Sequence, residues 1–302
     1  PILINQWANV VRWEMRTRLF LRTSEFLWQE GHTAHASEDE AREETLKILD
    51  IYESVSKNHL AIPVLTGKKS ESEKFAGAVD TYCIEAMMGD KRALQAGTSH
   101  YLGQNFAKAF DVKFQTENNT EEYVYASSWG VSTRLIGAII MVHGDDNGLR
   151  LPPSIAPTQV VVVPFFRSDE DLERIKNYIN PYLDQLSKSG IRFLLDEREK
   201  MSPGYKFNEW ELKGVPLRIE IGSKEIDSNE ITLFRRDTNE KSTVSSDNLI
   251  DTIHSTLDEI QENLYNQADK FRQENTFNVD NYEEFKNIIQ EGGFVRCGWD
   301  GT

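Results

Sequence analysis

Arginines, a carboxylate and an aromatic residue near the start of the sequence have the chemistry needed to bind a nucleotide. Arg12 and Glu14 are two residues apart, so on a strand their side chains would share one face. Arg22, Phe26 and Glu30 follow at intervals of four and would share one face of a second strand. Two such strands, joined by a short cationic loop, predict one surface able to hold phosphates, an exocyclic amine and the face of a base.

The pattern Arg-x-Glu, loop, Arg-x-x-x-Phe resembles motif 2 of the class II aminoacyl-tRNA synthetases. The sequence around it is similar to that of prolyl-tRNA synthetases. The similarity covers nearly the whole chain. It is strongest in five segments: residues 10–35, 74–78, 95–106, 128–134 and 203–216. Any one segment could arise elsewhere, but five in the family's order make the resemblance specific.

The resemblance implies activation of L-proline by ATP, followed by transfer of the prolyl group to the 3′ end of tRNA(Pro). Arg12 would contact the α-phosphate and the proline carboxylate, and Arg134 would hold the γ-phosphate from the other side. A planar guanidinium can hold two oxygens at once, which a lysine cannot. The ATP-binding residues that the resemblance implies are Arg12, Glu14, Arg22, Phe26, Gln95, Thr98, Ser132 and Arg134.

Proline is small and apolar, so its pocket should be tight, with aromatic walls and a few polar groups. The resemblance assigns Arg12, Trp28, His32, Phe75, His100, Ser128 and Gly130 to this pocket. Taken alone, the two aromatic residues would be read as core and the two histidines as structural. Residues 32–35, His-Thr-Ala-His, lack a third metal ligand at a supporting spacing, so no metal site is predicted there.

Magnesium is expected with ATP as a cosubstrate ion, and no tightly bound organic cofactor is expected. A cysteine-ligated zinc occurs in the C-terminal domain of some relatives, but Cys297 alone cannot form such a site. The interval from Ser37 to Ser127 is filled by family-matching sequence. The resemblance is therefore to the archaeal and eukaryotic type without an editing insertion.

The anticodon-binding region offers acidic and basic candidates for base recognition. The resemblance implies that Glu211, Arg218 and Lys224 read anticodon guanines, a role that suits carboxylate and guanidinium chemistry. Lys206 and Lys213 lie near Trp210 and are further cationic candidates. A solvated helix face is the alternative interpretation of these residues.

The elements that must position these residues predict an α/β protein. An α+β catalytic domain with the antiparallel sheet of class II synthetases is expected over residues 1–157, ending in a proline-rich linker at 151–157. Alternating strands and helices predict a mixed-sheet anticodon-binding domain over 158–265, followed by the start of a C-terminal domain at 266–302. Residues 38–57 are predicted to form a helix with Leu46, Leu49, Tyr52 and Val55 on its buried face.

Composition sets further bounds on the function. The formal net charge of −15 lacks the global basic footprint of nucleic-acid binders, although a local basic strip is sufficient for phosphate contacts. No apolar run is long enough to span a bilayer, so no membrane partner is expected. Two cysteines in 302 residues fit a reducing cytosol and predict a cytoplasmic protein.

The sequence is also expected to be truncated at both ends. Motif 1, through which class II enzymes form homodimers, has no counterpart here, and neither have the family's residues that bind the proline amine. The alternative to an active ligase is a synthetase-derived tRNA-binding or regulatory protein without catalysis. Such paralogues tend to lose the ATP arginines, whereas Arg12, Arg22 and Arg134 are all present.

Overall fold

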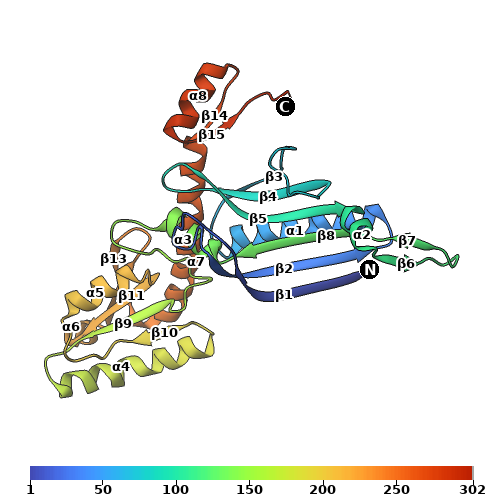
Figure 1. The fold of residues 1–302 in the computed structure, drawn as a ribbon. Coiled ribbons are helices and arrows are strands. Elements are labelled where there is room, and N and C mark those ends of the chain that lie inside the picture. The colour runs from blue at the N-terminus through green and yellow to red at the C-terminus, as the bar shows by residue number, and fades with distance from the viewer. Residues whose placement is uncertain (301–302) are drawn as a thin grey trace. The chain divides into compact units, whose positions relative to one another are not determined.

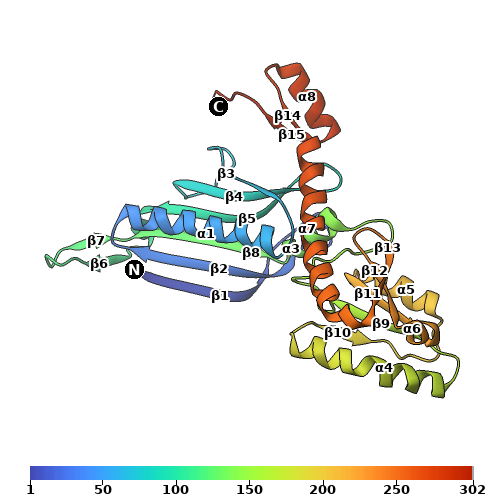
Figure 2. The ribbon, with the colours of Figure 1, turned by 180° about the vertical axis from the view of Figure 1, so that it is seen from behind.

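The computed structural model describes residues 1–300 and divides the chain into two compact units (Figures 1 and 2). The first unit contains residues 1–58, 62–142 and those from 269 onward, and the second contains residues 59–61 and 143–268. The domain boundaries expected after residues 157 and 265 stay predictions, because compactness is not a test of independent folding.

A six-stranded antiparallel sheet forms the centre of the first unit (Figure 1). Every neighbouring pair is antiparallel, as predicted for the catalytic core. In spatial order the strands are β1 (Ile2–Val11), β2 (Glu25–His35), β8 (Tyr125–Ser132), β5 (Ala93–Gly103), β4 (Asp80–Met87) and β3 (Val64–Lys68). The three central strands β2, β8 and β5 carry most of the predicted site residues.

Helix α1 (Glu38–Asn58) packs on one face of this sheet (Figure 2). The hydroxyl of Ser37 accepts a hydrogen bond from the backbone N–H of Glu40 at 3.4 Å, which supports the predicted helix start. Its buried residues are Ala41, Thr45, Leu49, Tyr52 and Ser56. The predicted apolar face was half wrong, because Leu46 and Val55 are 44% and 38% exposed.

The connection between β1 and β2 is longer than the sequence indicated. Residues 12–24 lie outside both strands, and within this loop Arg18 and Arg22 form an isolated bridge. The prediction that Arg12, Glu14 and Arg22 lie on strands was therefore wrong. Strand β8 includes Trp129 and Gly130 of the 128–134 segment.

The other elements of the first unit are shorter or follow the sheet. Helix α3 (Arg134–His143) begins directly after β8. The remainder are α2 (Asn105–Phe110), the hairpin of β6 (Lys113–Gln115) and β7 (Glu121–Tyr123), and the group β14 (Thr276–Asn278), α8 (Tyr282–Glu291) and β15 (Phe294–Arg296).

The second unit contains a five-stranded mixed sheet, as predicted. In spatial order its strands are β10 (Phe193–Leu195), β9 (Val160–Phe165), β11 (Leu217–Gly222), β12 (Glu230–Arg235) and β13 (Glu240–Ser245). The β10–β9–β11 pairings are parallel, and the pairings of β12 with β11 and β13 are antiparallel.

Helices cover both faces of this second sheet. Val160 and Val162 belong to the core that includes helices α4 (Asp169–Lys188) and α7 (Leu249–Glu274), whereas Val161 and Val163 pack with Trp210 of α5 (Pro203–Leu212). Burial on both faces explains the all-apolar sequence of β9. Ser168 and Ser202 cap α4 and α5 through side-chain hydrogen bonds to Asp171 and Tyr205.

Candidate functional site

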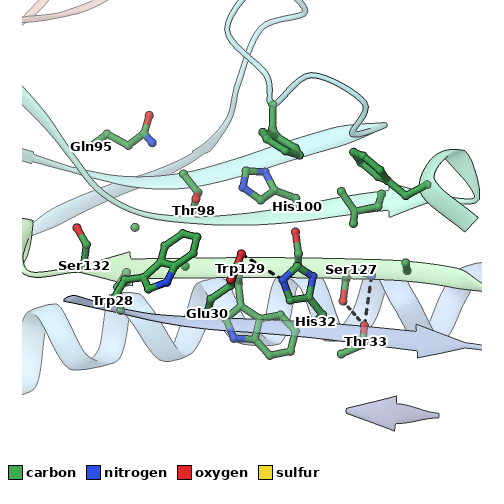
Figure 3. A pocket seen from close by; sticks show the side chains of 18 of the residues that line it. Trp28, Glu30, His32, Thr33, Gln95, Thr98, His100, Ser127, Trp129 and Ser132 are labelled. Atoms are coloured by element: carbon green, nitrogen blue, oxygen red, sulfur yellow. Dashed lines mark hydrogen bonds and ion pairs between the residues drawn. The ribbon is translucent and has the colours of Figure 1, made fainter. Parts of the chain in front are cut away.

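A cavity of about 630 Å³ lies on the first unit's sheet, on the face opposite α1 (Figure 3). Its walls come from β2, β5 and β8, from the loop that joins β1 to β2, and from the start of α3. Of the predicted ATP and proline residues, the cavity is lined by Arg12, Phe26, Trp28, His32, Phe75, Gln95, Thr98, His100, Ser128, Gly130, Ser132 and Arg134.

The register of the three central strands brings the predicted residues together in rows. Residues directly opposite on neighbouring antiparallel strands project from the same face of a sheet. The rows are Trp28 with Ser132, then Glu30 with Gly130 and Thr98, then His32 with Ser128 and His100. Segments up to about 100 residues apart in sequence therefore form one continuous floor.

One end of the cavity is cationic. The guanidinium of Arg134 donates from Nε to the backbone oxygen of Leu21 at 2.9 Å and from Nη1 to that of Gln95 at 3.3 Å. Burial lowers the pKa of Arg134, and the positive charges of Arg12 and Arg22 lower it further. Within residues 1–300, no carboxylate forms an ion pair with Arg134, so its charge is available to an anion.

Aromatic residues stand beside this cationic end. The guanidinium carbon of Arg12 lies 4.9 Å from the centroid of the Phe26 ring, and Phe26 meets Trp28 edge-on at 6.0 Å. The indole N–H of Trp28 is buried and has no hydrogen-bond partner among the described residues. An unpaired buried donor carries a free-energy penalty that a ligand oxygen would relieve.

A β-bulge places Gln95 and Thr98 on the same side of the sheet. Three residues apart on a regular strand, they would point to opposite faces. The pairing of β4 with β5 shifts between Ile84 and Glu85, where Gly97 and Gln95 are the respective partners and Ala96 has none. The extra residue re-aims the strand, and both side chains face the cavity (Figure 3).

The middle of the cavity is formed by rings and hydrogen-bonding groups. The rings of Phe75 and His100 are 4.9 Å apart, and burial lowers the pKa of His100 to about 4, so this imidazole is neutral at pH 7. His32 Nε2 lies 3.1 Å from Glu30, which also accepts a hydrogen bond from Gln6 at 2.6 Å (Figure 3). The Glu30 carboxylate is a hydrogen-bond acceptor that suits a ligand with an ammonium group.

Two predicted ATP residues lie outside the cavity lining. Glu14 and Arg22 form an ion pair at 2.7 Å on the loop before β2, and the hydrogen bond from Arg22 lowers the pKa of Glu14. The Arg22 side chain is 61% exposed. These residues are beside the cationic end and engage each other, so their contacts with ATP stay predictions.

The far end of the cavity is apolar and was not identified from the sequence. It is lined by Leu102, Phe106, Ala107, Phe110, Val112 and Val124. Apolar residues in strands and helices read as core, so the sequence carried no signal for this end. The carbonyl of Leu21 was missed as well, because any residue type can supply a backbone acceptor.

The predicted anticodon residues in the second unit have very different environments. Arg218 is buried between the rings of Phe207 and Phe234, 3.9 and 4.1 Å from their centroids. It pairs with Glu211 at 2.7 Å and with Glu220 at 2.9 Å. These contacts do not correspond to a solvated helix face.

The lysines of this region also divide. Lys206 is only 2% exposed and donates to the backbone oxygen of Asp196 at 2.8 Å, so the prediction that it is a surface cation for RNA was wrong. Lys224 lies exposed on α6 (Ser223–Ser228), and Lys213 pairs with Glu209 at the end of α5. The roles of Glu211, Arg218 and Lys224 in base recognition stay predictions.

Residues 1–300 contain neither a cluster of metal ligands nor a membrane-spanning helix. In this range no three His, Cys, Asp or Glu side chains are grouped closely enough to hold a metal ion. In the same range, every helix is too short or too polar to cross a membrane.

Comparison with known proteins gives two family matches and a set of full-chain relatives. Residues 1–143 match the model of the tRNA synthetase class II core domain (G, H, P, S and T), and residues 159–256 match that of the anticodon binding domain. Proteins named proline–tRNA ligase are 57% identical in Cytophaga hutchinsonii, 56% in Parabacteroides distasonis and 54% in Bacteroides fragilis. Each alignment covers 100% of this chain and 61–62% of the relative, so the chain spans about three-fifths of their length.

Proposed function

The chain belongs to the class II aminoacyl-tRNA synthetases and matches proline–tRNA ligases over its whole length, and from this we propose that it activates L-proline with ATP and transfers it to tRNA(Pro). The resemblance inferred from the sequence is thereby confirmed. The two family models account for a catalytic core and an anticodon-binding region in the predicted order.

The single observation that carries the proposal is the cationic end of the cavity. Arg134 is held by two neutral backbone oxygens, and the charges of Arg12 and Arg22 lie close enough to lower its pKa. Arg12 and Arg134 line the cavity and, within residues 1–300, neither forms an ion pair with a carboxylate, so together they form a site for a polyanion such as a triphosphate. Phe26 offers a ring for the base, and magnesium would enter with ATP as a cosubstrate ion.

The proposed reaction is attack of the proline carboxylate on the α-phosphorus of ATP, with formation of prolyl-adenylate and loss of pyrophosphate. Such chemistry depends mainly on alignment and on neutralising charge around phosphorus. Arg12 lies where the cationic end meets the aromatic middle, and we assign it to the α-phosphate and the carboxylate. Arg134 would hold the γ-phosphate.

The middle of the cavity is the proposed proline subsite. Trp28, Phe75 and His100 supply its apolar and aromatic walls, and Ser128 and Gly130 belong to its floor. An apolar pocket gains only about 10- to 200-fold selectivity for each methylene that a smaller amino acid lacks.

We further assign the second unit to tRNA(Pro) recognition, because it contains the region that matches the anticodon binding domain. A cytoplasmic location and a homodimer formed through motif 1 belong to the same proposal. Apart from residues 59–61, residues 37–127 belong to the first unit, which supports a synthetase without an inserted editing domain.

The test is proline-dependent exchange of labelled pyrophosphate into ATP by the protein at the full length of its relatives. We expect exchange with proline, weak exchange with alanine, and a loss of at least about 100-fold in Arg12→Ala. Arg18→Ala is the matched control, because Arg18 is an exposed arginine of the same loop that does not line the cavity.

A folded protein that binds tRNA without proline-dependent exchange would overturn the ligase proposal. It would leave the alternative of a synthetase-derived tRNA-binding protein. Equal losses in Arg12→Ala and Arg18→Ala would overturn the assignment of the cationic end.

A further inference from the structure

We propose that Thr81 is a positioning residue of the proline subsite, whose hydroxyl fixes His100 as the tautomer that carries its hydrogen on Nε2 and anchors Phe75 beside it. This inference rests on the proposed function and deepens it. Thr81 is not one of the residues that line the cavity, so it acts through its two neighbours.

One hydroxyl connects two walls of the cavity. Thr81 on β4 and His100 on β5 are directly opposite in the strand register, so both side chains project from the cavity face. Thr81 Oγ1 lies 3.0 Å from His100 Nδ1, and it accepts a hydrogen bond from the backbone N–H of Phe75 at 3.0 Å. Thr81 is 2% exposed, so water does not compete for these bonds.

The direction of the bond to His100 follows from the inventory of donors and acceptors. A threonine hydroxyl has one hydrogen to donate and two lone pairs to accept with. One lone pair receives the Phe75 N–H, and within residues 1–300 the only acceptor in contact with the hydroxyl hydrogen is His100 Nδ1. The reverse arrangement would leave a buried hydroxyl hydrogen unpaired, which is unfavourable.

The neutral imidazole then carries its remaining hydrogen on Nε2. His100 lines the cavity, so the subsite gains a neutral N–H donor and not a lone pair. Such a donor suits an acceptor oxygen of a bound aminoacyl group, while Glu30 and His32 line the cavity from β2, on the other side of β8.

The bond to Phe75 positions the segment between β3 and β4. Phe75 stacks with Phe106 at 6.2 Å and packs against His100, and its carbonyl accepts from the N–H of Ala78 at 3.0 Å. Gly77 follows in a left-handed conformation with φ of +91°. The Thr81 hydroxyl is thus a point where this turn is tied to the sheet.

The first experiment reads the tautomer directly. In protein with ¹⁵N-labelled histidine, His100 is assigned by its loss in His100→Gln, and the two ring nitrogens are distinguished by chemical shift at pH 7. We expect an unprotonated Nδ1 and a protonated Nε2. A protonated Nδ1 would overturn the inference, whatever the activity of the protein.

The second experiment separates positioning from general stability. In Thr81→Val, which keeps the side-chain shape, we expect the KM for proline to rise about 10-fold while the KM for ATP changes less than about twofold. Thr81→Ser should restore the proline KM. Thr45→Val is the matched control, because the Thr45 hydroxyl is equally buried but bonds only the Ala41 carbonyl of its own helix.

Parallel changes in both KM values, or the same proline effect in Thr45→Val, would show a merely structural role and overturn the inference. If Thr81→Val does not fold, Thr81→Ser and the labelled histidine spectrum decide the question. Absence of proline-dependent exchange in the unsubstituted protein would instead overturn the proposed function, and the spectrum would still report the tautomer.

Discussion

Arg134 in the first unit is half-buried and Arg218 in the second is buried, and their partners differ in kind. Arg134 bonds two backbone carbonyls, which are neutral, and two other arginines lower its pKa. Arg218 bonds the carboxylates of Glu211 and Glu220 and is enclosed by two phenylalanine rings. The charge of Arg134 is therefore left for a bound anion, whereas the charge of Arg218 is neutralised by carboxylates of the protein itself.

The difference teaches how to separate a binding arginine from a structural one. A buried cation without a counter-ion is unfavourable unless a ligand supplies the anion, so its retention indicates a function. A cation that is already paired and stacked stabilises its own surroundings.

The largest effect that would test this comparison is expected at Arg134. In Arg134→Lys, a point charge replaces the planar donor pair, and we expect pyrophosphate exchange to fall by about 100- to 1000-fold with the unfolding free energy little changed. Steady-state exchange and chemical denaturation would measure the two quantities. An exchange rate within a few-fold of the unsubstituted protein would show that the charge is not used.

At Arg218 the opposite pattern is expected. Arg218→Met removes the ion-pair partner of Glu211, whose side chain is 23% exposed, and one of the two partners of the buried Glu220, which also pairs with Lys241 at 2.6 Å. The free energy of unfolding should fall by about 3 kcal/mol. Proline-dependent exchange needs no anticodon contact and should persist at temperatures where the protein is folded. Denaturant titration of the variant measures the loss.

A combined variant sharpens this second test. Adding Glu211→Gln and Glu220→Gln to Arg218→Met removes the two carboxylate charges that Arg218 had neutralised, and should recover part of the lost stability. If the single Arg218 variant were as stable as the unsubstituted protein, the structural interpretation of this arginine would be wrong.

A smaller effect is expected where the first unit holds the Leu21 carbonyl in place. A Cβ on Gly137 of α3 would meet Leu21 Cδ2 at 2.5 Å and Phe20 Cβ at 3.2 Å. In Gly137→Ala we expect the KM for ATP to rise about 5- to 10-fold, because displacement of Leu21 weakens its hydrogen bond to Arg134.

Gly204→Ala is the matched control for this variant. Gly204 also lies in a helix, α5, but no atom of residues 1–300 beyond its own neighbours lies within 4 Å of its added Cβ. Both variants gain helix propensity, worth up to about 1 kcal/mol. An unchanged KM for ATP in Gly137→Ala would show that ATP binding by Arg134 does not depend on the position of the Leu21 carbonyl.

The smallest effect is the expected loss of stability as the pH is lowered. The pKa of His100 is lowered by burial to about 4 from an ordinary value of 6.5, so its stabilising contribution is complete above pH 6.5 and is lost as the pH falls toward 4. Burial alone would raise the pKa of Asp196, but Arg198 and Trp210 hold it at about 2, so its contribution is complete above pH 3.8 and is lost toward 2.

Thermal unfolding between pH 7 and 4.5 would measure the stability lost as His100 becomes protonated. We expect the unfolding midpoint to fall by a few degrees over this range, and to fall less in His100→Gln. The comparison between variants is needed because the pKa of buried His143 is also about 4. An identical pH dependence in His100→Gln would contradict the expectation.

Much of the fold followed from the sequence because apolar patterning responds directly to burial. The alternation of strands and helices predicted the mixed sheet, and the continuous valines of β9 match its burial on both faces. The predicted face of α1 was partly wrong because Ala41, Thr45 and Ser56 are buried, and small or polar residues carry little hydrophobic signal.

The site was predicted mainly through resemblance to a family, and its geometry only in part. Trp28, His100 and Arg134, which line the cavity, were among the residues that the resemblance named. The loop over residues 12–24 was predicted to be shorter, because Arg12, Glu14 and Arg22 were placed on the two strands. Backbone acceptors such as Leu21 and supporting hydroxyls such as Thr81 have no residue signature. Their roles depend on neighbours that only the folded chain brings together.

The bulge at Ala96 has a consequence for how this chain tolerates mutation. Ala96 lies in the core beside Leu49 and Tyr52, and a substitution there would disturb packing locally. Loss of its codon would leave Gln95 and Thr98 two residues apart on a regular strand, so their side chains would still share the cavity face. A one-residue deletion should therefore be tolerated better at Ala96 than at a regular position of β5, where it would turn one part of the strand to the opposite face.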